Sequence, residues 1–114
     1  MRVKRGVAAR KRHKRLLEKT KGMQGLRRAS VKKAREAVLK AEGYATRDRK
    51  ARKRDFRSLW IARIGAASRA EGLPYRELIS RLKERGVGLD RKILADLAVR
   101  EPEVFRQIIS EIRK

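Results

Sequence analysis

Cysteine is absent from this chain of 114 residues, and proline, aromatic residues and long apolar runs are scarce. Without cysteine the fold cannot contain a disulfide framework or a zinc ribbon, and no thiolate can act as a nucleophile. No apolar run approaches the roughly 18 residues that a membrane-spanning helix needs. The basic N-terminus is not followed by the apolar core of a signal peptide, so we expect a cytosolic protein.

Acidic residues are also few, because 35 lysines and arginines face 13 aspartates and glutamates, for a formal net charge of +22. Residues 1–57 hold 23 basic and 5 acidic residues, whereas residues 58–114 hold 12 and 8. A compact fold with the charge of the first half would repel itself, so we expect that half to become ordered on a polyanion. Nucleic acid is the first candidate. An anionic membrane is the second, although the apolar residues here are too scattered for a membrane-surface helix.

The first half of the chain predicts two helices with a turn between them. Residues 7–20 are good helix formers, and the two glycines within residues 21–25 indicate a turn. A long helix without proline then runs to Glu71, beginning near Leu26 or with Ser30 as its N-cap. Some 40 helical residues would extend over roughly 60 Å. We therefore expect an extended, helical appendage.

The second half predicts three shorter helices, because apolar residues recur there at helical spacing. Pro74 suits the first position of one helix, Asp90 should cap the next, and Pro102 should open the last. Together with the end of the long helix they should enclose one core. The predicted core residues are Leu59, Trp60, Ile64, Leu78, Leu82, Ile93, Leu97, Phe105 and Ile108. We predict an all-α protein in which a basic N-terminal extension, residues 1–57, leads into a small helical bundle, residues 58–114.

The run from Arg47 to Arg57 is the strongest local signal of function, with seven basic and two acidic residues in eleven. A solvated helix surface normally mixes charges of both signs, so we interpret this run as a phosphate-binding surface. On a helical wheel the same face becomes apolar around Trp60 and Ile64. One face of the long helix should therefore carry basic groups first and enter the core later.

Three aromatic residues and one histidine are candidates for contact with bases. Tyr44 lies among basic residues and is the best candidate for stacking, Trp60 is better explained as core, and Phe56 could serve either purpose. His13 is surrounded by basic residues and has no carboxylate nearby to orient it, so phosphate or base contact is expected rather than catalysis. No phosphate-binding glycine loop and no metal-ligand spacing is present. We expect no enzyme, no metal and no cofactor.

The segments "YATRDRKARKRDFRSLWIARI" and "GLDRKILADLAVREPEVF" resemble the family of the bacterial large-subunit ribosomal protein numbered twenty, and "VKRGVAARKRHKRLLEKTKG" resembles its N-terminus. The resemblance covers nearly the whole chain. The residues that match the family's signature spacing are Lys53, Arg57, Leu59, Trp60, Ile61, Arg63, Ile64 and Arg69. The chain departs from the family at Gly65, where Asn or Ser is usual, and at Met23, where an aromatic residue is common.

This resemblance implies a structural protein of the large ribosomal subunit, located in the cytoplasm. It implies that the extension threads into 23S ribosomal RNA, and that the protein binds RNA early in assembly beside neighbouring large-subunit ribosomal proteins. It further implies a bundle that can bind the protein's own messenger RNA and repress its translation. Neither a membrane nor a small-molecule substrate is implied.

Basic residues of the extension should make most of the RNA contacts, and four of the bundle should dock on an RNA junction. The predicted RNA-binding residues of the extension are Arg2, Lys4, Arg5, Arg10, Lys11, Arg12, His13, Lys14, Arg15, Lys21, Arg27, Arg28, Tyr44, Arg47, Arg49, Lys50, Arg52, Lys53, Arg54 and Arg57. Those of the bundle are Arg63, Arg69, Arg91 and Lys92. A chromatin-like protein that compacts DNA is the alternative, because a basic arm suits any phosphate polymer. A basic membrane-active helix is a third reading.

Overall fold

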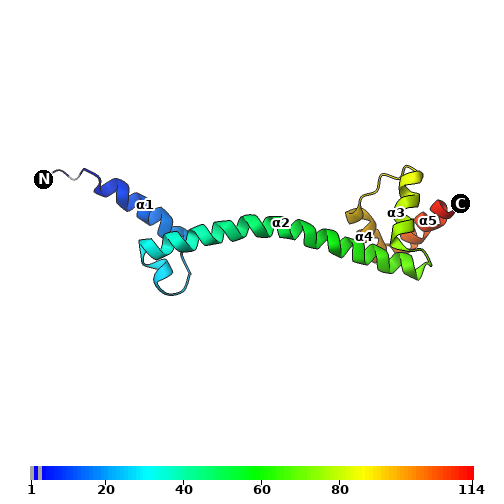
Figure 1. Ribbon diagram of the computed structural model, residues 1–114, viewed down its shortest axis with the longest axis horizontal. Helices are drawn as coiled ribbons and strands as arrows, with labels where there is room; N and C mark the ends of the chain where they lie inside the picture. Colours follow the sequence, from blue (N-terminus) through cyan, green and yellow to red (C-terminus); the bar gives the residue numbers. More distant parts are fainter. Residues whose placement is uncertain (1, 3) are drawn as a thin grey trace. The chain divides into compact units, whose positions relative to one another are not determined.

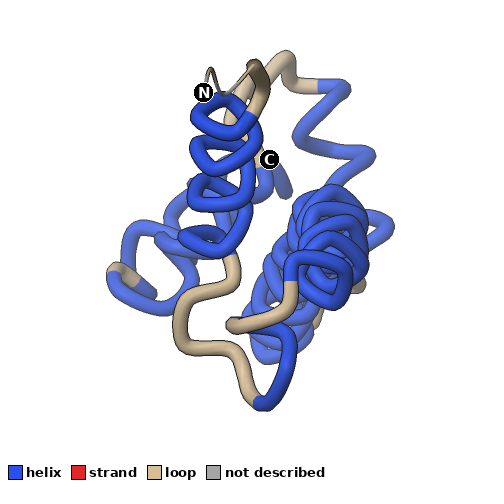
Figure 2. The backbone as a smooth tube through the Cα atoms, turned by 90° about the vertical axis from the view of Figure 1, so that its left-hand side faces the viewer, coloured by secondary structure: helices blue, strands red, loops and turns tan. Residues whose placement is uncertain are grey.

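The structure, a computed structural model, describes Arg2 and residues 4–114, and these residues are mainly helical (Figures 1 and 2). The elements are α1 (Gly6–Lys19), the 3-10 helix η1 (Gly25–Arg28), α2 (Val31–Ala70), α3 (Tyr75–Glu84), α4 (Arg91–Arg100) and α5 (Pro102–Arg113). The described part of the chain contains no strand, which confirms the predicted all-α class. Met1 and Val3 belong to the predicted extension and lie outside the described residues.

Backbone contacts divide the chain into two compact units, the first covering Met1–Lys50 and the second Ala51–Lys114. The first unit contains α1, η1 and the beginning of α2. Among the described residues of this unit, those that are buried are Thr20, Ala34 and Val38. The Thr20 hydroxyl donates to the Leu17 carbonyl oxygen at 3.1 Å, just where α1 ends. The core of this unit is therefore made of small side chains.

Helix α2 begins directly after Ser30, whose carbonyl oxygen accepts the hydrogen bond of the Ala34 amide at 2.8 Å. At its other end, Gly72 adopts a φ of +71°, which a glycine reaches without steric cost. The Leu73 amide donates to the Ser68 carbonyl and the Gly72 amide to the Arg69 carbonyl, both at 2.9 Å. This pair of bonds is the Schellman motif, which satisfies the last carbonyls and turns the chain toward α3.

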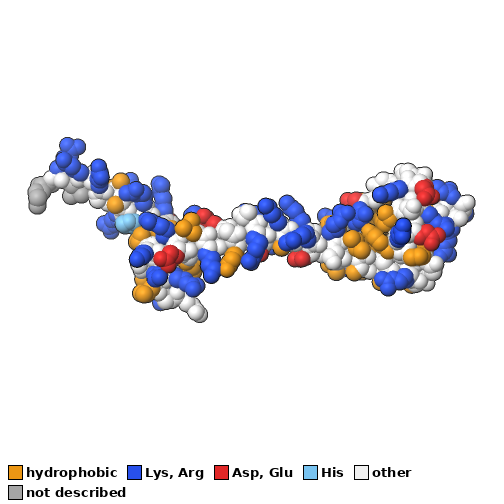
Figure 3. Space-filling view, viewed as in Figure 1, with side chains coloured by type: hydrophobic (Ala, Val, Ile, Leu, Met, Phe, Trp, Pro, Cys, Tyr) orange, Lys and Arg blue, Asp and Glu red, His pale blue; other side chains and the backbone are white. Residues whose placement is uncertain are grey.

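The second unit packs α3, α4 and α5 around the C-terminal part of α2 (Figure 1). Figure 3 shows apolar side chains gathered among these helices, with lysines and arginines around them. The buried cluster consists of Ile64, Leu73, Leu78, Leu82, Leu94, Ala95, Phe105, Ile109 and Ile112. Trp60, Leu97 and Ile108 are partly buried and pack against it. Seven of the nine predicted core residues are thus in or against this cluster.

The prediction was wrong for Leu59 and Ile93, whose side chains are 41% and 46% exposed. The exposure of both residues follows from their angular position on the helix and not from their hydrophobicity. At 100° per residue, Leu59 lies about 120° from the centre of the buried face formed around Trp60 and Ile64. Ile93 is displaced by a similar angle from the buried face of α4, which is centred near Leu94. Each side chain therefore points past the core into solvent.

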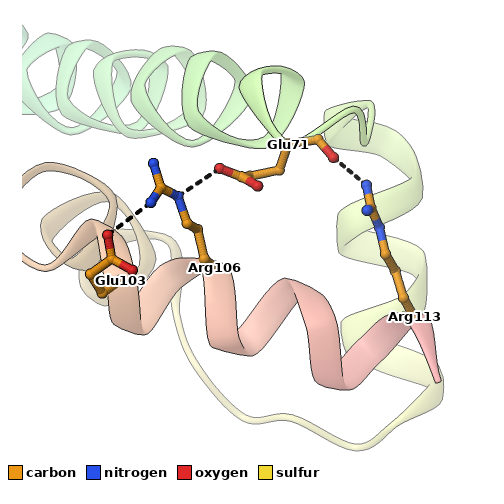
Figure 4. Close-up of polar contacts among 4 residues, drawn as sticks. All are labelled: Glu71, Glu103, Arg106 and Arg113. Atoms are coloured by element: carbon orange, nitrogen blue, oxygen red, sulfur yellow. Dashed lines mark hydrogen bonds and ion pairs between the residues drawn. The ribbon is translucent and has the colours of Figure 1, made fainter.

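Polar contacts at Glu71 hold α5 against the end of α2 (Figure 4). Arg106 Nε donates to the Glu71 carboxylate at 2.9 Å, and its Nη1 donates to Glu103 at 2.8 Å. Arg113 donates to the Glu71 carbonyl oxygen. The Glu71 hydrogen bond raises the pKa of Arg106 above its ordinary value, with a further contribution from the charge of Glu103. The predicted Asp90 cap is confirmed, because its Oδ1 accepts from the Ile93 amide at 2.8 Å.

Candidate nucleic-acid interface

The basic side chains of α1 are exposed, and residues three or four apart share a face of the helix. One shallow hollow is lined by Arg5, Ala8, Lys11, Arg12 and Arg15. A second is lined by Arg10, His13, Lys14, Leu17, Glu18 and Lys21. The first of these surfaces carries four cations and no carboxylate. Such a surface attracts polyanions, and it attracts the phosphate backbone of a nucleic acid whatever its nucleotide sequence.

Carboxylates neutralise little of the positive charge of the first unit. It holds 19 basic and 4 acidic residues, and three of the four acids form ion pairs. Lys19 Nζ lies 2.8 Å from Glu42 Oε1, which joins the end of α1 to α2. Lys33 and Glu36 pair at 3.1 Å within α2. Even with every carboxylate paired, 15 cations would remain for an external polyanion.

Tyr44, the predicted stacking residue, is 45% exposed and lies under two cations. The Arg47 guanidinium carbon is 4.4 Å from the ring centroid, and the Lys40 Nζ is 5.6 Å from it. Arg47 Nε also donates to Asp48 Oδ1 at 2.8 Å. That hydrogen bond raises the pKa of Arg47 and lowers the pKa of Asp48. Asp48 thus pairs with its neighbour Arg47, and part of the Tyr44 ring is already occupied by cations.

Phe56 and Trp60 stand one turn apart on α2, with ring centroids 6.1 Å apart and planes tilted by 35°. They line one hollow with four cations, Arg52, Lys53, Arg57 and, from α4, Lys92. Trp60 is half-buried against the core, whereas Phe56 is 48% exposed. We call this set of six side chains the aromatic hollow. The structure brings three predicted residues of α2 together with one that lies some 35 positions further along the chain.

The four basic residues predicted for the bundle have different surroundings. Arg63 and Lys92 are exposed and line a neighbouring hollow that also contains Asp90, Asp96 and Arg100. Arg69 Nε donates to the Gly65 carbonyl oxygen at 3.2 Å, and Arg91 Nε donates to the Tyr75 hydroxyl at 3.0 Å. Arg69 and Arg91 therefore also stabilise the bundle, while Arg63 and Lys92 are free of such internal hydrogen bonds in the described structure.

Phe56, for which the sequence left stacking on a base and packing in the core both open, is 48% exposed beside Trp60. Phe56 lies four residues before Trp60, so the two rings share one face of a helix. The described residues contain no group of three or more His, Cys, Asp or Glu side chains that could hold a metal ion. None of the described helices is both long and apolar enough to cross a membrane.

Comparison with known proteins places the chain in a family. A profile of the family described as Ribosomal protein L20 matches residues 2–108. The large ribosomal subunit protein bL20 of a Roseiflexus species is 57% identical over 113 residues, which cover 99% of this chain and 97% of that protein. Its counterparts from Thermomicrobium roseum and Erythrobacter litoralis are 55% and 51% identical, over 100% and 98% of this chain and 97% and 94% of theirs. The chain belongs to the ribosomal protein L20 family.

Proposed function

We propose that this protein is a structural constituent of the large ribosomal subunit, binds 23S ribosomal RNA directly and promotes early assembly of the subunit. The observation that carries the proposal is the first unit, where 19 basic residues meet 4 acidic ones around a core of three small side chains. Such a unit needs a polyanion to neutralise it. Relatives that are named as proteins of the large ribosomal subunit support ribosomal RNA as this polyanion.

The proposed mechanism is neutralisation of phosphates that folding of the RNA brings close together. Each lysine or arginine that contacts a phosphate releases condensed counterions, so affinity falls as salt rises. Phosphate contacts position the protein but do not read sequence. Specificity then depends on the shape of the folded RNA and on a few side chains that meet unpaired bases. The extension, residues 1–57, would lie between RNA helices.

The second unit is proposed to dock on an RNA junction through the exposed cations Arg63 and Lys92, beside neighbouring ribosomal proteins. The same surface is the candidate for binding the protein's own messenger RNA and repressing its translation. Both RNAs would offer the same groups, namely phosphates and unpaired bases. Arg69 and Arg91 would contribute mainly by holding this surface in shape, because each is hydrogen-bonded within the bundle.

Competition at matched salt tests this function against that of a DNA compactor. The full chain would be bound to labelled 23S ribosomal RNA and challenged with duplex DNA or with unlabelled ribosomal RNA, in equal amounts of phosphate. We expect ribosomal RNA to compete far better than DNA, because a shape-dependent contact adds to the common phosphate term. Equal competition by the two polymers would instead identify a non-specific binder of phosphate polymers.

A further inference from the structure

We propose that the aromatic hollow is a binding site for one unpaired nucleotide of RNA, with the base stacked on Phe56 and its phosphates held by the surrounding cations. The inference rests on the proposed function and adds a specific contact to it. All six side chains belong to the second unit, five from α2 and Lys92 from α4.

Phe56 has the properties of a stacking platform. The residue is 48% exposed on a helix, although an aromatic side chain gains much from leaving water. It also has a neighbour on one side, because the ring centroid of Trp60 lies 6.1 Å from that of Phe56, and Trp60 itself packs against the core. A platform that is held in place loses little conformational entropy when a flat ligand covers it. The exposed part of the ring is therefore prepared for an aromatic partner.

The charges around Phe56 define the chemistry of that partner. Arg52, Lys53, Arg57 and Lys92 line the hollow, and no carboxylate does. A neutral apolar ligand would bury these cations without compensation, and a simple phosphate ion would leave the ring uncovered. A nucleotide offers both a flat aromatic base and a negative charge. A base-paired duplex does not fit, because its bases already stack on each other.

Two other surfaces lack this combination of an exposed ring and unpaired cations. In the hollow beside the aromatic hollow, Asp90 and Asp96 are present, and Asp96 pairs with Arg100 at 3.0 Å. At Tyr44, cations at 4.4 and 5.6 Å already lie over the ring. A base would have to displace Arg47, which Asp48 also holds. In the described structure no cation is placed over Phe56 in that way.

The experiment measures how much of the affinity depends on bases. The full chain is titrated with oligoadenylate of about nine nucleotides and with a ribose-phosphate chain of equal length without bases, and the ratio of the two affinities is taken. The wild type should favour oligoadenylate by about 5- to 150-fold, since stacking of one base is worth about that much. Binding of oligoadenylate should also change the fluorescence of Trp60, the single tryptophan of the chain.

Substitutions at Phe56 should move this ratio without moving phosphate binding. Phe56→Leu keeps the apolar volume but lacks the flat ring, so the ratio should fall toward one while affinity for the baseless chain stays constant. Phe56→Tyr should keep the ratio. Leu59→Ala is the matched control, because Leu59 is an exposed apolar residue of the same helix that does not line the hollow. It should leave the ratio unchanged.

A wild-type ratio in the Phe56→Leu protein, with an unchanged Trp60 signal, would overturn the inference. If that protein still prefers ribosomal RNA over DNA in competition, the proposed function stands and only the nucleotide site is lost. If the wild type itself shows no such preference, the proposed function has failed. An acidic peptide rich in phenylalanine could instead displace oligoadenylate at a peptide concentration below that of the oligoadenylate. That result would assign the hollow to a protein partner and would also overturn the inference.

Discussion

The two units of this protein balance charge against hydrophobic burial in opposite ways. The first holds 19 basic and 4 acidic residues, and its described part buries three small side chains, whereas the second holds 16 and 9 around a cluster of nine buried residues. Burial of apolar surface is the main favourable term in folding, and self-repulsion opposes it. The second unit therefore has its own source of stability. The first has far less, and its stability should come from the polyanion that we propose it binds.

Loss of a core side chain in the second unit should have the largest effect. Phe105 is 2% exposed, and Phe105→Ala should lower the free energy of unfolding by about 3–5 kcal/mol. Amide hydrogen exchange should show this loss within residues 51–114 and little change in residues 1–50. Val104→Ala is the control, since Val104 is 39% exposed on the same helix and should change stability by about 0.5 kcal/mol or less. Equal loss of protection in both units would mean that the first unit depends on the core of the second for its stability.

Removal of charge should show whether the basic surface of α2, which extends from the first unit into the second, binds RNA. Arg49, Lys53 and Arg57 are exposed along α2, and replacing all three with alanine should weaken binding to ribosomal RNA. The slope of log affinity against log salt should flatten by about 2 to 3, which corresponds to three phosphates. Alanine at Arg76, Lys83 and Arg85 removes the same charge from exposed positions of the bundle. If this second variant flattens the slope equally, total charge matters and the α2 surface does not.

The two glycines of α2 offer a smaller test, one in each unit. A Cβ atom at Gly43 would meet nothing within 4 Å, and one at Gly65 would lie 3.6 Å from Arg69 Nη2 and 3.8 Å from Tyr75 Cβ. The space at Gly43 is open, and the two distances at Gly65 are ordinary van der Waals contacts. Alanine should therefore stabilise the helix at either position by about 1 kcal/mol. Gly65→Ala should raise the thermal midpoint of the bundle. Gly43→Ala should raise helix content in the first unit by circular dichroism, and leave that midpoint unchanged.

Two buried hydroxyl groups allow the finest comparison. Thr20 is fully buried and donates to the Leu17 carbonyl, so Thr20→Val should cost about 1 kcal/mol. Ser68 is also fully buried, but its Oγ has no hydrogen-bond partner within the described structure. Ser68→Ala should therefore be neutral or stabilising by up to about 1 kcal/mol. Chemical denaturation measures both, and a clear loss at Ser68 would mean that its hydroxyl has a partner.

Local chemistry made most of the helices predictable from sequence. Predicted bounds of 7–20 for the first helix differ by one residue at each end from Gly6–Lys19. The long helix ends at Ala70, beside the predicted Glu71, because glycine follows and can adopt a positive φ. Asp90 caps α4 as its type and position indicate. These features depend on residues within one turn of each other, so a single sequence contains them.

Features that depend on packing direction were not predictable in the same way. Leu59 and Ile93 have the composition of core residues but the wrong angular position on their helices. Lys92 of α4 lines the same hollow as Phe56 of α2, and no local sequence pattern indicates that the two residues share a surface. Burial of Thr20 depends likewise on the fold of the first unit. Sequence indicated which residues are basic or apolar, and the structure was needed to show which of them meet.

The place of α5 in the core has a consequence for how the protein is made. Phe105, Ile109 and Ile112 complete the cluster of the second unit, so this core cannot close during synthesis before α5 exists. At 5–20 residues per second, roughly 3–12 seconds separate the synthesis of Lys50 from that of Ile112. A nascent chain thus displays its cationic segment to surrounding polyanions while its globular part is still incomplete. Synthesis from the N-terminus therefore allows the cationic segment to attach to a polyanion before the C-terminal core has folded.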